Sequence, residues 1–246
     1  KIKIADSRVS ITDDGYLMEI DQPDRIGPED ISFKTKNLTF CVKDPDIEKN
    51  GERHKWISDY VNKAEEALLG SNFLDETEGY ANYFDKVSFV DWYLINEITK
   101  NNDACFFSSC YLNITPGGKL KMGPLWDYDI ALGNVNYNDN QSYEGFWIKK
   151  KVTWFSRMFE DPSFVALVKE RFAYFKSKEN DMLTNINENA TYLKFSVIEN
   201  NAKWNTLYEQ TWPNYAVWGS YNNEVQYLKQ WLSKRLAWLE SAFSEL

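Results

Sequence analysis

Histidine is almost absent from the sequence, with His54 alone among 246 residues, and cysteine occurs only three times. A single histidine excludes zinc sites that are built from several imidazoles. It also argues against catalytic triads that use histidine as the base. The three cysteines include no CxxC pair and do not make a disulfide framework. We expect His54 to have a structural role.

Long apolar runs and excess positive charge are also missing. No run of about 18 apolar residues occurs, so the sequence predicts no transmembrane helix. There are 28 basic against 37 acidic residues, a formal net charge of −9. Because an acidic surface repels phosphate backbones, nucleic acid is not an expected partner. No targeting segment is present, and the chain opens on Lys1, so we expect it to be a piece of a longer protein.

Aromatic residues, in contrast, are abundant, at 16% of the chain with ten tryptophans. One interpretation is an aromatic-rich core with aromatic helix seams. The other is a platform for sugar rings, because Tyr and Trp combine an apolar face with a polar edge. We interpret the tryptophans of the C-terminal region as core residues: Trp204, Trp212, Trp218, Trp231 and Trp238.

Hydrophobic periodicity predicts an α+β fold in one domain, residues 1–246, with a β region first, a central hairpin and a helical C-terminal half. Ser88 and Asp91 have the spacing of a helix-capping box, and Asp161-Pro162 resembles an N-cap followed by a first-turn proline. A polar loop is predicted over 135–144. The predicted strands are 1–4, 16–20 and a pair within 31–42, with a turn at 13–15; the predicted helices are 56–69, 88–99 (with a start as early as Tyr80), 154–159, 162–176, 180–199 and one from 222 onward.

The central hairpin carries the acidic residues of interest. We predict strands over 108–114 and 119–125, joined by a type II turn at Thr115-Pro-Gly-Gly118. Asp103 precedes this hairpin, and Asp127 and Asp129 follow it. Because the two strands of a hairpin run antiparallel, we expect the three carboxylates to share one neighbourhood. Asp127 and Asp129 are two residues apart, so on a regular strand both would face the same side.

Clustered carboxylates raise one another's pKa, and a divalent cation relieves that cost. Carboxylate and water oxygens suit Mg²⁺ or Mn²⁺. Phosphoryl transfer needs one carboxylate that orients the nucleophile and another that holds the metal on the phosphates. The alternative is purely local, since Asp is common in turns and at helix ends. Glu97 has two interpretations as well, either as a group that holds the helix next to the site or as a surface charge.

Several segments resemble the CotH (spore coat protein H) family of atypical kinases. The strongest is Gly118-Lys-Leu-Lys-Met-Gly-Pro-Leu-Trp-Asp-Tyr-Asp129, followed by Ala131 and Gly133-Asn134. Upstream, Ser88-Phe-Val-Asp-Trp-Tyr-Leu-Ile-Asn-Glu97 and Asn102-Asp103 also fit, as do Gly15-Tyr-Leu-Met-Glu19 and Lys43-Asp-Pro-Asp46. The resemblance is strongest over residues 11–175.

The resemblance implies an atypical protein-kinase-like fold and a bacterial enzyme that transfers phosphate from ATP to serine of secreted or coat proteins with Mg²⁺ or Mn²⁺. Asp103 would take the position of the catalytic acid, Asp127 the metal-binding position, and Asp129 a supporting one. Asn102 and Ser108 would line the site. Where typical kinases carry a second metal-binding residue, an Asn, this chain has Ser108, a weaker ligand.

The family's nucleotide-binding part is expected upstream of this chain, so the nucleotide-binding residues are unknown and the fragment is expected to be inactive, or nearly so, alone. Gly117-Gly-Lys119 is not followed by Ser or Thr, so it is no phosphate-binding loop. The implied location is extracytoplasmic or at the cell surface. Two alternatives stay open: a non-catalytic coat, envelope or glycan-binding scaffold, and a glycoside hydrolase using two of the carboxylates.

Overall fold

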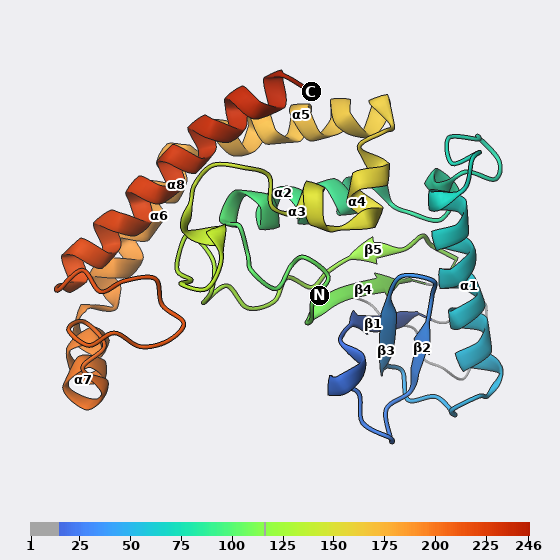
Figure 1. Ribbon diagram of the computed structural model, residues 1–246, viewed down its shortest axis with the longest axis horizontal. Coiled ribbons are helices and arrows are strands. Elements are labelled where there is room, and N and C mark those ends of the chain that lie inside the picture. Colours follow the sequence, from blue (N-terminus) through green and yellow to red (C-terminus); the bar gives the residue numbers. More distant parts are fainter. Residues whose placement is uncertain (1–14, 116) are drawn as a thin grey trace. The chain divides into compact units, whose positions relative to one another are not determined.

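The computed structural model describes residues 15–115 and 117–246, and the chain divides into two compact units (Figure 1). The first unit contains the described residues up to Tyr93 together with 103–126 and 148–165. The second contains 94–102, 127–147 and 166–246. The acid-bearing segment therefore contributes residues to both units, with Asp103 in the first and Asp127 and Asp129 in the second.

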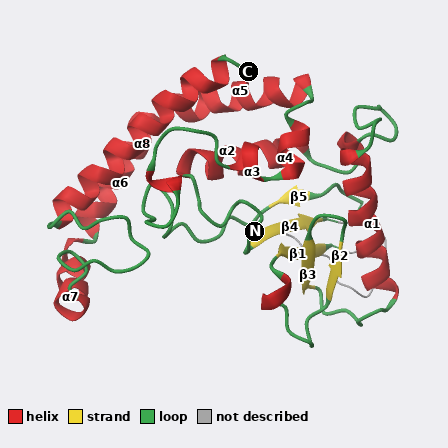
Figure 2. Cartoon of the chain, viewed as in Figure 1, coloured by secondary structure: helices red, strands yellow, loops and turns green. Residues whose placement is uncertain are grey.

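A five-stranded antiparallel sheet in the order β2-β3-β1-β4-β5 forms the described β-structure of the first unit (Figure 2). The α+β prediction is confirmed, and so are the strand at 16–20 and the pair within 31–42. The predicted strand at 1–4 and the turn residues 13 and 14 lie outside the described residues. The strands are β1 (Tyr16–Ile20), β2 (Ser32–Lys34), β3 (Thr39–Asp44), β4 (Cys110–Ile114) and β5 (Lys121–Met122).

Strand β1 lies in the middle of the sheet and is buried along nearly its whole length. Tyr16, Met18 and Ile20 are at most 1% exposed. Glu19 is also buried, and its carboxylate lies 2.8 Å from the ammonium of Lys43 on β3. A buried carboxylate needs such a partner, because burial penalises the charged form. Of the family-like residues, Glu19 and Lys43 therefore form one ion pair across two neighbouring strands.

Helices complete the first unit. Helix α1 buries the stripe Ile57, Val61, Ala64 and Leu68, and it ends at Gly70 as predicted. The helices and 3₁₀ turns are η1 (Pro23–Arg25), α1 (Glu52–Leu69), η2 (Tyr80–Asn82), the first part of α2 (Lys86–Thr99), α3 (Ile148–Lys151), α4 (Thr153–Met158) and the start of α5 (Pro162–Ser177).

The predicted capping box at the start of α2 is wrong. Asp85 caps this helix instead, since its carboxylate accepts the backbone N–H of Ser88 at 3.0 Å. The Ser88 hydroxyl is used elsewhere, because it accepts the N–H of Met122 at 2.8 Å. A residue that the pattern assigned to a local cap therefore joins α2 to the hairpin strand β5.

The second unit is helical. Helix α6 (Glu179–Tyr192) runs beside α8 (Tyr221–Ser244), and α7 (Lys194–Trp204) follows α6 (Figure 1). The single helix predicted over 180–199 is thus two helices separated at Leu193, where no Gly or Pro marks the break. The core interpretation holds for buried Trp231 but is wrong for three other tryptophans: Trp204, Trp212 and Trp218 are 60%, 72% and 38% exposed.

Asp161 caps α5 as predicted, and it also gathers partners from elsewhere in the first unit. Its Oδ1 accepts the N–H of Ser163, and its Oδ2 lies 2.7 Å from Lys86 Nζ and 2.6 Å from the Tyr80 hydroxyl. Burial alone would raise the pKa of Asp161. The hydrogen bonds from Lys86, Tyr80 and Ser163 outweigh burial and lower the pKa to about 2.

Replacing Asp161 by asparagine should therefore lower the free energy of unfolding by about 2 kcal/mol at neutral pH. Because the folded pKa is depressed, this contribution is complete above about pH 4 and disappears as the pH falls toward 2. Urea unfolding of the wild type and Asp161→Asn at several pH values measures the difference. A difference that does not shrink on acidification would contradict this assignment.

Candidate functional site

The central hairpin forms as predicted but is shorter on its second side. Strands β4 and β5 pair Leu112 with Met122 and Asn113 with Lys121. At the turn, Gly118 N–H donates to Thr115 O at 2.8 Å and Gly117 has φ +64°, as a type II turn requires; residue 116 lies outside the described residues.

Strand β5 ends at Met122: Gly123 still donates its N–H to Tyr111 O at 2.8 Å, but its φ of +117° turns the chain away from the strand. The side chain of Asn113 donates to Gly123 O at 2.9 Å and fixes this exit. The prediction that Asp127 and Asp129 share one side of a regular strand is therefore wrong. Residues 123–128 have no regular secondary structure, and Asp127 itself has φ +51°. The relative orientation of the Asp127 and Asp129 side chains is therefore set by the loop, and the alternation of side chains along a strand does not apply.

Asp103 lies in a turn of the first unit after α2 and is half-buried. Its backbone carbonyl accepts the Phe107 N–H at 3.3 Å and the Cys110 thiol at 3.4 Å. These contacts fix the backbone of Asp103 through its carbonyl. Burial raises the pKa of the Cys110 thiol, so this cysteine acts as a neutral donor and not as a thiolate.

Ser108, the second predicted residue in the first unit, is buried and has a partner that sequence reasoning missed. Arg25, in η1, donates from Nη1 to Ser108 Oγ at 2.8 Å, and its guanidinium lies 5.5 Å from the centre of the Phe107 ring. Arg25 is exposed. The two residues are 83 positions apart, and nothing in the loop around Arg25 indicates the contact in the sequence. The pairing places a permanent positive charge beside a predicted site residue.

In the second unit, the loop that carries Asp127 and Asp129 is tied to the end of α2. Asn101 donates from its side chain to Asp127 O at 2.9 Å, and the Tyr128 hydroxyl donates to Asn96 Oδ1 at 3.0 Å. The backbone follows the same course, since Asn102 N–H donates to the carbonyl of residue 130. The loop is therefore positioned by hydrogen bonds of its backbone and of Tyr128, and the carboxylates of both aspartates stay exposed.

Both polar atoms of the Asn102 side chain, a predicted site-lining residue, bond neighbouring residues of the chain. Its Nδ2 donates to the Tyr137 hydroxyl at 2.7 Å, and its Oδ1 accepts from Asn138 Nδ2 at 2.7 Å. Both ends of the amide thus hold the polar loop that follows the acidic segment. Asn102 directly precedes Asp103 in the chain, so these bonds also restrain the backbone on which the catalytic candidate is carried.

Glu97 is fully buried, so its interpretation as a surface charge is wrong. Its Oε1 lies 2.7 Å from Arg235 Nη2 on α8, and it also accepts the N–H of Trp147. Arg235 donates further to the carbonyls of Tyr143 and Gly145, each at 2.8 Å. The other interpretation, that Glu97 holds the helix beside the site, is the one that the structure supports.

Buried Lys100 serves the same polar loop. Its ammonium donates to Ser142 O at 2.8 Å and to Glu144 O at 2.7 Å, and Asn140 donates back to the Lys100 carbonyl. These bonds commit Lys100 to the loop and make it unsuitable as a phosphate ligand.

Unusual backbone conformations concentrate around the acidic segment. In the described part of the chain, five of the seven non-glycine residues with positive φ lie within 100–132. Such conformations cost free energy and gather at functional sites, because the surrounding structure must enforce them. The five residues are Lys100, Phe106, Ser109, Asp127 and Leu132.

Asp127 and Asp129 are the residues of the second unit that could hold a hard divalent cation. Among residues 15–115 and 117–246, no three His, Cys, Asp or Glu side chains form a group that could hold a metal. Mg²⁺ does not require such a cage, since it keeps several waters and is commonly held by one or two carboxylates and by substrate phosphates. The exposed carboxylates of Asp127 and Asp129 meet this smaller requirement.

Comparison with known proteins gives one family. A family model described as CotH kinase protein matches residues 3–239, nearly the whole chain and all of the predicted site residues. The comparisons with curated proteins and with solved structures found no match. Within the described residues, no helix is long and apolar enough to cross a membrane.

Proposed function

Because this chain belongs to the CotH kinase family, we propose that it carries the catalytic acids of a metal-dependent kinase that phosphorylates serine in proteins. The observation that carries the proposal is the match over residues 3–239, which includes Asp103, Asp127 and Asp129. The acceptor is proposed to be a protein of coat or envelope type, reached at the cell surface. ATP is the proposed phosphate donor.

In this proposal Asp103 orients the acceptor serine and takes the proton of its hydroxyl. A bond forms between the serine oxygen and the γ-phosphorus, while the bond from that phosphorus to the bridging oxygen of ADP breaks. Asp127, with support from Asp129, would hold Mg²⁺ or Mn²⁺, and the ion would neutralise charge on the phosphate oxygens. Arg25, beside Ser108, supplies positive charge in the same unit as Asp103.

A thermal-shift experiment with Mn²⁺ or Mg²⁺, with and without ATP, tests the metal site directly. A ligand at 100 times its Kd stabilises the folded state by about 2.7 kcal/mol, which appears as a higher melting temperature. Metal should raise the melting temperature of the wild type, and Asp127→Ala should remove that rise. A further rise with ATP in the presence of metal would mean that this chain alone can hold a nucleotide.

The matched control is Asp139→Ala, which removes another exposed carboxylate of the second unit. This variant should keep the full response to metal. If millimolar metal leaves the wild-type melting temperature unchanged, or if Asp127→Ala responds like the wild type, Asp127 is not a metal ligand and the proposal fails.

A further inference from the structure

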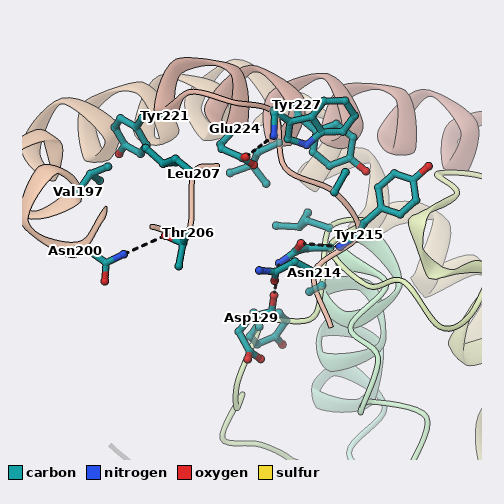
Figure 3. A pocket seen from close by; sticks show the side chains of 17 residues that line it. Asp129, Val197, Asn200, Thr206, Leu207, Asn214, Tyr215, Tyr221, Glu224 and Tyr227 are labelled. Atoms are coloured by element: carbon teal, nitrogen blue, oxygen red, sulfur yellow. Dashed lines mark hydrogen bonds between the residues drawn. The ribbon is translucent and has the colours of Figure 1, made fainter. Parts of the chain in front are cut away.

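The second unit contains a cavity of about 480 Å³ that shares only Asp129 with the residues of the proposed phosphoryl transfer (Figure 3). It lies between the loop carrying Asp129, α7, the segment 205–219 and the start of α8. Figure 3 shows Tyr221, Glu224 and Tyr227 of α8 on one side and Asp129 with Asn214 on another. Its volume lies within the range of small-molecule sites.

Three aromatic rings that line this cavity are stacked in two pairs. The Tyr227 ring stacks with Trp218, with ring centres 4.6 Å apart and planes inclined by 26°, and with Tyr215, with ring centres 6.4 Å apart and planes inclined by 27°. Trp218 and Tyr215 are 38% and 41% exposed although both are large aromatic residues. The stack therefore presents flat apolar ring surface to solvent at the cavity, which is the aromatic platform that composition alone left as an alternative.

Burial, with the nearby Tyr215 and Glu224, raises the pKa of Tyr227 to about 12. Its hydroxyl therefore stays protonated at physiological pH and donates to Gly133 O at 3.3 Å. The Tyr227 ring is thus fixed to the loop that carries Asp129. A glycine is required at 133, which has φ +83°, because a Cβ there would collide with the indole of Trp231.

Charge decides which ligands this cavity excludes. Asp129 and Glu224 line it, and none of the described residues that line it is basic. Without a bound cation, an anionic ligand would meet two carboxylates there, so the lining favours a neutral ligand.

The remaining polar lining is made of neutral amides and hydroxyls. Asn134 donates to Asn214 Oδ1 at 2.9 Å, and Asn200 donates to the Thr206 hydroxyl at 3.3 Å. Amides offer both donors and acceptors, and carboxylates accept, so together they match a ligand with many hydroxyl groups.

We propose that this cavity binds a neutral saccharide, with a pyranose ring against Trp218 and its hydroxyls on the amides and carboxylates. The proposal does not depend on the phosphoryl-transfer function. A ligand cation is the other chemistry that two carboxylates and aromatic rings suit. The saccharide is favoured because Glu224 Oε1 already accepts the backbone N–H of Trp218 at 2.8 Å, which makes this carboxylate less available to a cation.

Calorimetry and saturation-transfer NMR with soluble neutral oligosaccharides test the proposal in the presence of EDTA and without ATP. The probes are oligomers of glucose, xylose, mannose and N-acetylglucosamine. At least one should bind, and Trp218→Ala should weaken that binding about tenfold or more. Trp218→Phe, which keeps a ring, should retain part of the affinity. Asn200→Ala removes a lining amide without changing the stack, and it should also weaken binding.

The matched control is Trp204→Ala, because Trp204 is 60% exposed in the same unit but does not line the cavity. It should bind like the wild type. No binding by any probe at millimolar concentration would overturn the proposal. So would equal binding by Trp218→Ala, Asn200→Ala and the wild type. Binding of tetramethylammonium or a lysine peptide in place of every sugar would identify a cation site instead. Because metal and ATP are omitted, these outcomes are independent of the kinase test.

Discussion

Replacing Asp103 by asparagine should reduce the rate of phosphoryl transfer by about 10²- to 10⁴-fold while the melting temperature changes little. Asparagine has the same shape as aspartate but cannot accept the proton of the acceptor hydroxyl. The half-buried position of Asp103 and the bonds of its backbone carbonyl do not depend on the carboxylate charge. The loss should therefore appear in kcat, with the affinity for ATP and metal largely kept.

The measurement uses the full-length protein with radiolabelled ATP, Mn²⁺ and a library of serine-containing peptides as acceptors. Asp59→Asn is the control, because Asp59 is exposed on α1 of the same unit. It should keep the wild-type rate. An Asp103→Asn enzyme as fast as the wild type would remove Asp103 from the chemistry, even if the metal response of Asp127 were intact.

Replacing Glu97 by alanine should destabilise the second unit by about 3–5 kcal/mol. The change leaves the guanidinium of Arg235 buried without its carboxylate, and both side chains of the pair are 0% exposed in the wild type. It also removes the acceptor of the Trp147 N–H. Urea unfolding followed by circular dichroism measures the loss, which should be large enough to populate unfolded protein at physiological temperature.

Two comparisons separate the buried ion pair from a general loss of charge. Asp181→Ala removes an exposed partner of Lys178 in the same unit, and it should have little effect on stability. The double variant Glu97→Leu with Arg235→Met should recover much of the loss, because a well-packed apolar pair avoids the buried charge. A double variant as unstable as Glu97→Ala would show that the carbonyl contacts of Arg235 dominate instead.

Local patterns in the sequence predicted the elements well where neighbours in the chain decide them. A stripe of six residues predicts α1, and Gly70 ends the helix as expected. Four of the six are buried, Ile57, Val61, Ala64 and Leu68, while Tyr60 and Ala67 are half-buried. The hairpin turn follows from its own residues in the same way. Ser88 shows the limit. Its spacing to Asp91 matches a cap, yet its hydroxyl bonds the backbone of Met122, a distant contact that no local pattern contains.

The family resemblance names candidate site residues, but their geometry could not be predicted from the sequence. The family-like string locates Asp127 and Asp129, but the positive φ of Gly123 ends the strand that was expected to align them. Arg25 reaches Ser108 across 83 positions, and Arg235 reaches Glu97 across 138. Such contacts result from tertiary packing, and a single sequence carries no signal for which distant cation meets which residue.

The polar loop after the acidic segment, residues 135–145, should not tolerate a change in its length. Loops usually tolerate insertions, because each doubling of length costs only about 0.6 kcal/mol. Here the carbonyls of Ser142 and Glu144 surround the ammonium of Lys100, and those of Tyr143 and Gly145 surround the guanidinium of Arg235. These four consecutive carbonyls replace the hydration shells of two buried cations. One added residue would shift these carbonyls away from the ammonium of Lys100 and the guanidinium of Arg235. Both buried cations would then lose hydrogen-bond acceptors, so the length of this loop is constrained by the two cations that it binds.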